Sequence, residues 1–273
     1  MITCDLHNHT LYSHAKDTVQ DMYQSAVSRG LAIFGFSEHS PRPLKYTYPV
    51  EYRDRLNAHL QDYVDEVQAL KKADGPCRVL FGMEIDWFED DADFVRQASC
   101  QFPFDYLIGS THFLGTWGYD ASPEPWEKMS EEKKFECYTA YFKTWRKMLA
   151  TGLFQIAAHP DLIKIFSMDS FHSWIVKEES QRLIKDALEV LKANNMAMEI
   201  SSAGLRKPCH EIYPCPLIMR LASEVQCQIS FASDAHNVAD VAYGFPVLAS
   251  YARAFGFAHS VYYAEKQCHE LAF

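Results

Sequence analysis

The sequence predicts a single α/β domain in which parallel strands alternate with helices, arranged as a sheet or as a barrel. Seven short apolar runs of strand length recur along the chain, and polar stretches with helical spacing follow them. Of the 273 residues, 48% are apolar, which suffices for one sizeable core, and no repeat or low-complexity linker divides the chain. We therefore expect one domain over residues 1–273. The predicted strands are Ile2–Leu6, Leu31–Phe36, Val79–Ile85, Tyr106–Ser110, Phe154–Ala158, Met196–Ile200 and Ile229–Ala232.

Between these strands the apolar residues follow a helical period. After the second strand they step by four and three positions, which places them on one face of a helix. The residues of this face are Leu56, Leu60, Tyr63, Val67 and Leu70. Further helices are predicted over residues 17–29, 130–149 and 183–191, and the second of these begins Ser-Glu-Glu, with acids in its first turn.

Net charge and cysteine usage restrict the class of protein. A net charge of −10 argues against a nucleic-acid surface, because phosphate backbones require clustered lysine and arginine. The first residues do not resemble a secretory signal, and no apolar run approaches the roughly 20 residues of a membrane-spanning helix. We therefore expect a soluble, cytoplasmic protein without a membrane partner. The eight scattered cysteines are expected to be reduced, with Cys209 and Cys215 as the one pair to check for a disulfide.

Six of the seven predicted strands end in residues that can bind a metal ion. In parallel barrels the carboxyl ends of the strands meet at one mouth, and residues i and i+2 of a strand point the same way. These residues therefore predict a metal cluster at the mouth. In chain order they are His7, His9, His14, His39, Glu84, His112, His159, Asp234 and His236.

Each of these residues has an ordinary alternative when it is taken alone. An isolated histidine such as His112 is more often a hydrogen-bonded core or surface residue, and Glu84 could be a plain strand-end carboxylate. The joint pattern favours metal binding, because ligand types at the same end of six strands are improbable by chance. Histidine with carboxylate, and no thiolate, suits Zn²⁺, Fe²⁺ or Mn²⁺. The remaining histidines do not follow strands and are left out of the cluster: His59, His172, His210, His259 and His269.

Two long segments interrupt the alternation of strands and helices. Ser40–Val50 is rich in proline and tyrosine, and Phe113–Trp126 is rich in glycine, proline and tryptophan. Because both follow the carboxyl end of a predicted strand, both are candidate walls of a pocket.

These motifs resemble the polymerase-and-histidinol-phosphatase (PHP) superfamily, and the resemblance covers essentially the whole chain. Its pattern is a His-x-His near the start, a glutamate after the third strand, isolated histidines after the fourth and fifth, and a closing Asp-x-His. The resemblance implies a distorted (β/α)7 barrel, similar to a TIM barrel, that holds two to three divalent metal ions. It also implies three ligand groups: His7, His9, Glu84 and Asp234; Glu84 as a bridge with His112 and His159; and His14, His39 and His236.

Within the superfamily, several phrases resemble the histidinol-phosphate phosphatases. Examples are Gly109-Ser-Thr-His-Phe113, Ser202-Ala-Gly-Leu-Arg-Lys207 and Glu211-Ile-Tyr-Pro214. This narrower resemblance implies hydrolysis of L-histidinol phosphate in histidine biosynthesis. The metal motifs alone leave other substrates open, such as another small phosphomonoester or a nucleotide end. A non-catalytic metal-binding domain and an amidohydrolase barrel are further alternatives, which the complete ligand set and the coupled Asp-Ala-His disfavour.

The same residues permit a mechanism. A hydroxide between two metals bridged by Glu84 would attack phosphorus, and Asp234 or His236 could relay a proton to the leaving group. Fixed positive charge for the phosphate is predicted at Arg206, because a guanidinium suits bidentate phosphate contact, and after it at Lys164 and Arg42. Glu211 could meet a substrate amine. Aromatic residues that could stack on an imidazole are Tyr46, Tyr48, Trp117 and Tyr119, and the sequence gives no oligomeric state.

Overall fold

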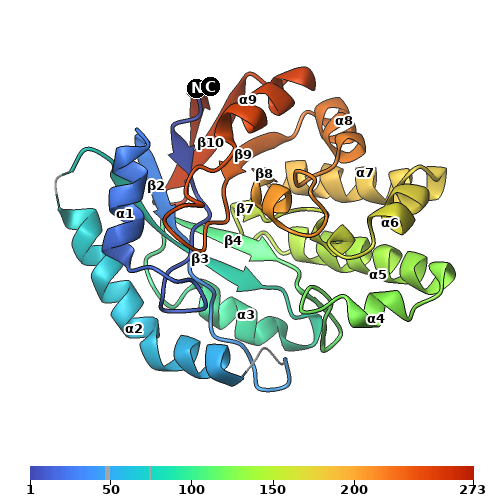
Figure 1. Ribbon diagram of the computed structural model, residues 1–273, viewed down its shortest axis with the longest axis horizontal. Helices are drawn as coiled ribbons and strands as arrows, with labels where there is room; N and C mark the ends of the chain where they lie inside the picture. The colour runs from blue at the N-terminus through green and yellow to red at the C-terminus, as the bar shows by residue number, and fades with distance from the viewer. Residues whose placement is uncertain (47–49, 74) are drawn as a thin grey trace.

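Seven parallel strands form the centre of the protein, with helices around them (Figure 1). The computed structural model describes residues 1–46, 50–73 and 75–273. The strands are neighbours in the order β1-β2-β3-β4-β7-β8-β9. All seven predicted strands are confirmed, with shorter bounds for β1, β2 and β7. The observed bounds are β1 (Cys4–Asp5), β2 (Ile33–Phe36), β3 (Arg78–Asp86), β4 (Tyr106–Ser110), β7 (Ile156–Ala157), β8 (Ala197–Ser201) and β9 (Gln228–Ala232).

The first and last strands of this sheet also meet. The backbone N–H of Leu6 donates to the carbonyl of Phe231 at 3.4 Å, and Asn8 and Ala235 form an isolated parallel bridge. The sheet therefore closes on itself, and the predicted seven-stranded barrel is confirmed. It is distorted because β1 and β7 contain only two residues each, so that short ladders join them to their neighbours.

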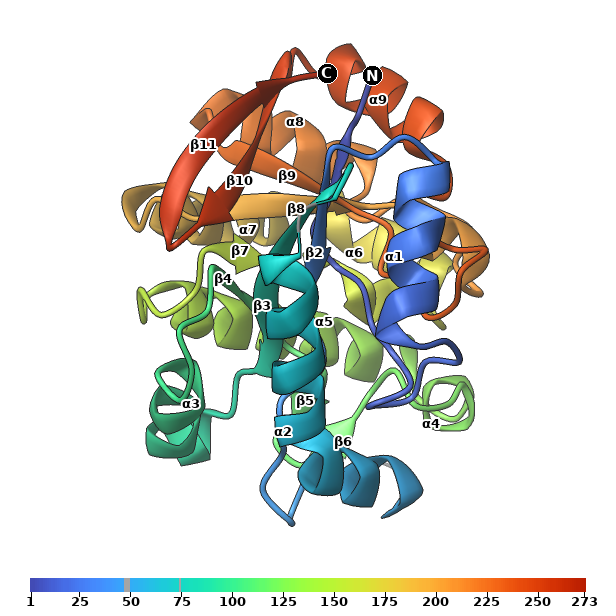
Figure 2. The same ribbon diagram turned by 90° about the vertical axis from the view of Figure 1, so that its left-hand side faces the viewer.

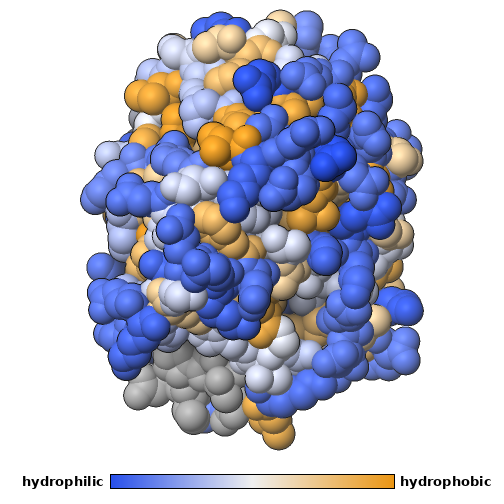
Figure 3. Space-filling model, turned by 90° about the vertical axis from the view of Figure 1, so that its right-hand side faces the viewer, coloured by the Kyte–Doolittle hydropathy of each residue, from blue (hydrophilic) through white to orange (hydrophobic). Residues whose placement is uncertain are grey.

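Helices of different lengths cover the outside of the barrel. The four predicted helices are confirmed as α1, α2, α5 and α7, and the side chain of Ser130 caps α5 by accepting from the backbone N–H of Lys133. Figure 3 shows the side on which α5, α6 and α7 lie in Figure 1, where most exposed side chains are hydrophilic. These helices bury their apolar faces against the barrel. The bounds are α1 (Val19–Ser28), α2 (Val50–Lys72), α3 (Ala92–Ser99), α4 (Glu124–Glu127), α5 (Glu131–Leu149), α6 (Met168–Ile175), α7 (Glu178–Ala193), α8 (Pro216–Val225) and α9 (Phe245–Ala254).

Alternation along the strands separates two cores. In β3, Phe81 and Met83 belong to the large core between strands and helices, whereas Leu80 belongs to a smaller cluster inside the barrel. Because successive side chains of a strand point to opposite faces, Gly82 and Glu84 continue the inward series that Leu80 begins. One strand therefore carries an apolar residue at the bottom of the barrel and a carboxylate near its mouth.

Tyr106 fills the middle of the barrel. It is fully buried, and its hydroxyl donates to the carbonyl of Leu6 at 2.6 Å. Two glycines, one on β2 and one on β3, make room for its ring. A Cβ atom on Gly35 would lie 2.1 Å from the Tyr106 hydroxyl oxygen, and one on Gly82 would lie 2.5 Å from the ring. Glycine is needed at both positions because the aromatic ring occupies the space of a side chain.

A hairpin that the sequence did not predict closes the floor of the barrel (Figure 2). It consists of β10 (His259–Ala264) and β11 (Gln267–Ala272), and residues of β10 join the cluster inside the barrel. Its turn is held by Asp105, just before β4, whose carboxylate accepts from the backbone N–H of Glu265 at 3.0 Å. The Tyr263 hydroxyl donates to the carbonyl of Asn195, shortly before β8. The hairpin therefore lies across the amino ends of the strands, opposite the predicted metal ligands.

All eight cysteines are free, as expected, and Cys209 and Cys215 form no disulfide. Within the described residues, no helix has both the length and the apolar composition required to cross a bilayer.

Candidate metal centre at the barrel mouth

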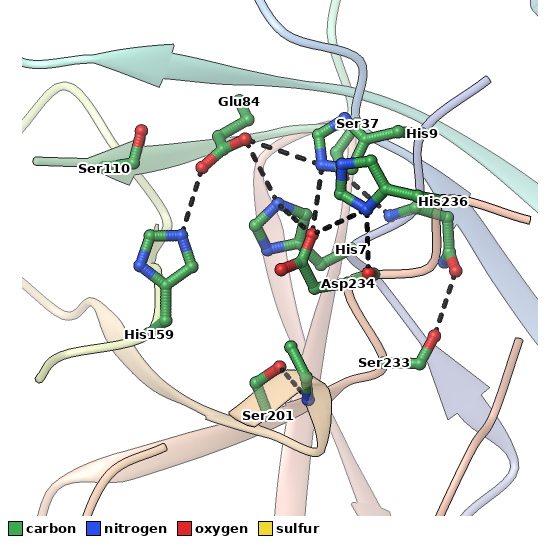
Figure 4. A network of polar contacts seen from close by, with 12 residues as sticks. His7, His9, Ser37, Glu84, Ser110, His159, Ser201, Ser233, Asp234 and His236 are labelled. Atoms are coloured by element: carbon green, nitrogen blue, oxygen red, sulfur yellow. Dashed lines mark hydrogen bonds and ion pairs between the residues drawn. The ribbon is translucent and has the colours of Figure 1, made fainter. Parts of the chain in front are cut away.

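Glu84 lies at the centre of the predicted cluster, near the carboxyl end of β3 (Figure 4). Its carboxylate is buried, and one oxygen, Oε1, faces the two isolated histidines that follow β4 and β7. His159 Nε2 lies 3.3 Å from this oxygen, and His112 Nε2 lies 3.7 Å from it. The three side chains offer ligand atoms that all lie within 4.8 Å of one another.

The other oxygen of Glu84, Oε2, faces the His-x-His pair after β1. His7 Nε2 lies 3.3 Å from it, and His9 Nε2 lies 3.6 Å from it. Asp234 approaches the same two nitrogens from the loop after β9, with its Oδ1 atom 3.4 Å from His9 Nε2 and 4.0 Å from His7 Nε2. Glu84 thus separates two sets of imidazoles, one on each of its oxygens, which is the placement required of a bridging carboxylate.

A third group forms beside His9. His9, His39 and His236 offer nitrogen atoms within 4.8 Å of one another. The ring of His14 lies beside them, with centroid distances of 4.4 Å to His236 and 4.9 Å to His39. The structure therefore brings the predicted third set together and places His9 between it and the first set.

The loop that carries Asp234 and His236 is fastened to β1. The buried carboxylate of Asp5 accepts hydrogen bonds from the hydroxyl of Ser233 at 2.6 Å and from its backbone N–H at 3.0 Å. Asp234 itself adopts a left-handed conformation with φ of 49°, which directs the chain so that Asp234 and His236 both face the cluster.

Buried carboxylates support three of the ring nitrogens that face away from the cluster. Glu199 lies 2.7 Å from His7 Nδ1, and Asp86 lies 2.5 Å from His112 Nδ1. Glu38 lies 3.2 Å from His9 Nδ1. A hydrogen bond at Nδ1 fixes the ring and leaves Nε2 with its lone pair toward the cluster, as in many metal sites.

These supporting residues were missed in the sequence, although period-two spacing offered a signal. Asp86 follows Glu84 by two positions, and therefore points to the same side of β3. Glu199 lies within β8, the one strand for which the sequence predicts no metal ligand at its end. The strand-end pattern does not extend to a carboxylate inside an apolar run, so no direct signal in the sequence points to Glu199.

The residues fit a bound divalent cation. His7 Nε2 and His9 Nε2 are buried without a hydrogen-bond partner among the described residues. Both nitrogens face Glu84 Oε2, which also lies 2.8 Å from His39 Nδ1. Buried polar atoms without partners cost free energy, and a cation between the nitrogens and this oxygen would supply the partner that the two nitrogens lack. The donor set contains imidazole nitrogen and carboxylate oxygen without thiolate, which suits a first-row divalent metal.

Electrostatics act differently on the members of the cluster. Although burial opposes it, Glu199 and Glu84 raise the pKa of His7. Against the same effect of burial, Asp86 and Glu84 raise the pKa of His112 to about 9. A metal ion bound at either imidazole would therefore displace a proton.

Other members of the cluster already favour the form that binds a metal. Burial lowers the pKa of His39 well below its ordinary value, and burial together with neighbouring His9 lowers the pKa of His236 to about 3. Burial alone would raise the pKa of Glu84, but His39 and His7 outweigh it and hold that pKa well below its usual range. Neutral imidazole and ionised carboxylate are the forms that bind metals.

A small pocket opens above these groups. The larger hollows of the surface lie elsewhere, over α1 and α9, and none of the predicted ligands lines them. The pocket wall adds Asp120, Leu162 and Lys207 to the cluster. Its lining residues are His14, His39, Glu84, His112, Asp120, His159, Leu162, Lys207, Asp234 and His236. Of the two segments expected to wall the pocket, Phe113–Trp126 supplies Asp120.

Arg206, predicted to contact the phosphate, does not line this pocket in the structure. Its guanidinium donates to the carbonyls of Ser233 and Asp234 at 2.8 and 3.1 Å and pairs with Asp240 at 3.2 Å. Arg206 therefore braces the loop behind the cluster. The next residue, Lys207, lines the pocket instead, with its Nζ atom 3.8 Å from Asp234 Oδ2.

Lys164 and Glu211 also have other partners than those predicted. The ammonium group of Lys164 is fully buried and lies within 3.0 Å of Asp161 Oδ2, Glu211 Oε2 and the carbonyl of Ile212. Three acceptors use its three protons, so none remains for a phosphate. Glu211 is likewise committed to Lys164, and these two residues tie the loop after β7 to the loop after β8.

Arg42 is buried beside the cluster and pairs with Asp86, the carboxylate that supports His112. It does not line the pocket. In this position Arg42 orients Asp86, and the geometry lends no support to a direct phosphate contact.

The aromatic residues proposed for stacking pack elsewhere or fall outside the described residues. Tyr46 is buried against Phe88, with ring centroids 3.9 Å apart, and the hydroxyl of Tyr119 donates to the carbonyl of Thr111. Trp117 packs on other aromatic rings, and Tyr48 lies outside the described residues. The described members of this set are thus packing residues.

Comparison with known proteins agrees with this geometry. The model of the PHP domain family matches residues 5–203, which is more than half of the chain. The chain belongs to the PHP domain family. A relative from Deinococcus radiodurans, named a probable histidinol-phosphatase, is 33% identical over 245 residues, which is 89% of each chain. The histidinol-phosphatase of Bacillus subtilis is 25% identical over 88% of this chain and 96% of its own length.

A solved structure shows the same fold. It is the histidinol phosphate phosphatase of Lactococcus lactis in complex with zinc, L-histidinol and phosphate. Its TM-score is 0.76 at 17% identity, and 98% of each chain is covered. The barrel of this PHP-family member is therefore shared over nearly its full length with that phosphatase.

Proposed function

We propose that this protein is a metal-dependent phosphomonoesterase that hydrolyses L-histidinol phosphate to L-histidinol and phosphate. The observation that carries the proposal is the position of Glu84, with His112 and His159 on one carboxylate oxygen and His7 and His9 on the other. The histidinol-phosphatase names of relatives that cover most of the chain support the substrate. The place of this reaction is histidine biosynthesis in the cytoplasm, a setting with which eight free thiols agree.

Two to three divalent ions, of zinc, iron or manganese, would occupy the mouth. His7, His9, Glu84 and Asp234 would hold one, and Glu84 with His112 and His159 a second. The third would lie with His14, His39 and His236. When bound, such ions activate water as a nucleophile near neutral pH and offset the charge of a phosphate group.

The protein side chains orient the substrate in this scheme. Lys207, the one lysine or arginine among the described residues lining the pocket, contacts a phosphate oxygen through its Nζ atom. Glu84, Asp234 and His236 are the residues closest to the chemistry. The carboxylate of Asp234, whose Oδ2 atom faces Lys207, would take a proton from the attacking water and pass it to the departing alkoxide, while His236 keeps its Nδ1 atom on the carbonyl of Asp234.

A phosphate-release assay on metal-reconstituted protein tests the proposal. We expect kcat/KM for L-histidinol phosphate to exceed that for p-nitrophenyl phosphate and for other small phosphomonoesters by at least about tenfold, a difference of about 1.4 kcal/mol. Equal values would leave a phosphatase without the proposed substrate, and no release from any of them would refute phosphatase activity itself.

A further inference from the structure

One wall of the pocket carries a carboxylate that the metal cluster does not use. Asp120 is partly exposed and lines the same pocket as His112, Lys207 and Asp234. Among the described residues, no side chain or backbone N–H forms a hydrogen bond or ion pair with its carboxylate. It is also absent from the three groups of described residues whose atoms are close enough to share a metal ion.

The segment that presents Asp120 is held through the residue that precedes it. The preceding residue, Tyr119, is fully buried and donates its hydroxyl proton to the carbonyl of Thr111 at 2.6 Å. Trp126 donates its indole N–H to the carbonyl of Tyr119 at 2.7 Å, and the backbone N–H of Tyr119 reaches the carbonyl of His112 at 3.3 Å. The carboxylate is thus attached to the same chain segment as a predicted ligand and held at the pocket wall.

The two charged side chains of the wall outside the cluster have opposite signs. Lys207 pairs with Asp234, and it lies beyond ion-pair distance of Asp120. A substrate that matches both charges carries a phosphate group for Lys207 and, close to that phosphate, a positively charged group for Asp120. L-Histidinol phosphate has this form, since its ammonium group is on the carbon next to the CH₂–O–P group.

We propose that Asp120 binds the ammonium group of the substrate and makes the enzyme selective for phosphate esters of 2-amino alcohols. This inference rests on the proposed function for the identity of the phosphate ester, but it concerns only the recognition of the amine. A carboxylate without a partner, held within reach of a phosphate site, forms a charge-assisted hydrogen bond with an ammonium group. Asp120 takes the role that the sequence had suggested for Glu211, which Lys164 occupies.

The test compares substrates that differ only in the amine. The pairs are L-histidinol phosphate with 3-(imidazol-4-yl)propyl phosphate, and O-phosphoethanolamine with ethyl phosphate. We expect wild-type kcat/KM to favour the amine in each pair by about tenfold to a hundredfold, the range of one charge-assisted hydrogen bond. Asp120→Asn should reduce both ratios to near one by lowering kcat/KM for the amines, with metal content unchanged by elemental analysis.

Two further variants keep the test decisive. Glu124→Gln changes an exposed carboxylate of the same segment and should leave the ratios as in the wild type. Asp120→Glu keeps the charge and should retain part of the amine preference, which a purely structural role would not produce.

Other outcomes would overturn the inference. Unchanged ratios in Asp120→Asn would place amine recognition elsewhere. If Asp120→Asn lowered kcat/KM equally for both members of a pair and also lost metal, Asp120 would have a role in metal binding. The same equal fall with metal retained would indicate a role in proton transfer or in structure. The two proposals separate cleanly, because a wild-type enzyme that favours amines but not the imidazole would refute histidinol phosphate and retain Asp120.

Discussion

The two ends of the barrel are built from the same strands, but buried polar side chains gather at one end and apolar side chains at the other. At the mouth, buried histidines and the carboxylate of Glu84 face one another, and His7 Nε2 and His9 Nε2 have no hydrogen-bond partner in the described part of the chain. Toward the floor, apolar residues surround the ring of Tyr106, whose hydroxyl is hydrogen-bonded, and the β10–β11 hairpin closes this end of the barrel. The residues for chemistry therefore lie at the carboxyl ends of the strands, and those for stability lie toward the amino ends. Changes at one end should leave the other largely intact.

The largest expected effect is at the mouth. Glu84→Ala removes the carboxylate that faces both sets of histidines, so we expect metal on both sides to be lost and kcat to fall at least about a thousandfold. Elemental analysis and phosphate release measure the two effects. The floor should not respond, and the melting temperature of the metal-free variant should match that of metal-free wild type. Unchanged metal content would refute the bridging role of Glu84.

In the middle of the barrel, below the metal cluster, Gly35→Ala should do the reverse. Its Cβ atom would meet the Tyr106 hydroxyl at 2.1 Å, and overpacking of this kind costs about 2–3 kcal/mol. For a chain of this length, this lowers the melting temperature by roughly 5–10 °C, measurable by calorimetry. Gly118→Ala is the matched control, because its added Cβ would meet its nearest neighbour at 3.4 Å, an ordinary contact. Loss of metal in Gly35→Ala at a temperature where it is folded would contradict the division between the ends.

Glu199 tests whether the division is sharp, because it is a β8 residue that supports His7 from within the barrel. Glu199→Gln keeps the shape and removes the charge, so we expect metal affinity to fall by about tenfold to a hundredfold. Competition with a chelator measures this affinity. A variant that binds metal as tightly as wild type but melts at a much lower temperature would show that Glu199 contributes to stability and not to metal binding.

The smallest expected effect separates two adjacent cations at the mouth. Lys207→Met should raise KM for the phosphate ester by about tenfold with metals retained, because it removes one charge-assisted contact. Arg206→Met should act mainly through the loop that carries Asp234, and therefore lower both metal content and stability. Steady-state kinetics with elemental analysis distinguish the two. The reverse pattern would restore Arg206 as the phosphate contact.

The strands and the convergence of the ligands were predictable because both follow from local rules. Apolar runs mark strands, and the ends of parallel strands meet, so His7 and His236 could be placed together although 229 positions separate them. The directions in which side chains point from irregular backbone could not be predicted. Arg206 and Lys207 are neighbours at the end of one 3₁₀ turn, and only the fold determines which of them lines the pocket.

The missed parts depended on partners distant in the sequence. The polar composition of β11 hid the hairpin in the sequence, because β10 packs into the barrel while β11 contributes chiefly Leu271. Lys164 resembled a free cation in the sequence, whereas Asp161 and Glu211 surround it in the fold.

The floor hairpin has a consequence for synthesis of the chain. Every predicted metal ligand lies between His7 and His236, whereas β10 begins at His259. On the ribosome, the complete ligand set therefore emerges before the segment that covers the apolar interior around Tyr106. At this stage the nascent chain contains every predicted ligand, but the hairpin does not yet cover its apolar interior. A chaperone or an aggregating neighbour would bind this uncovered apolar surface at the floor.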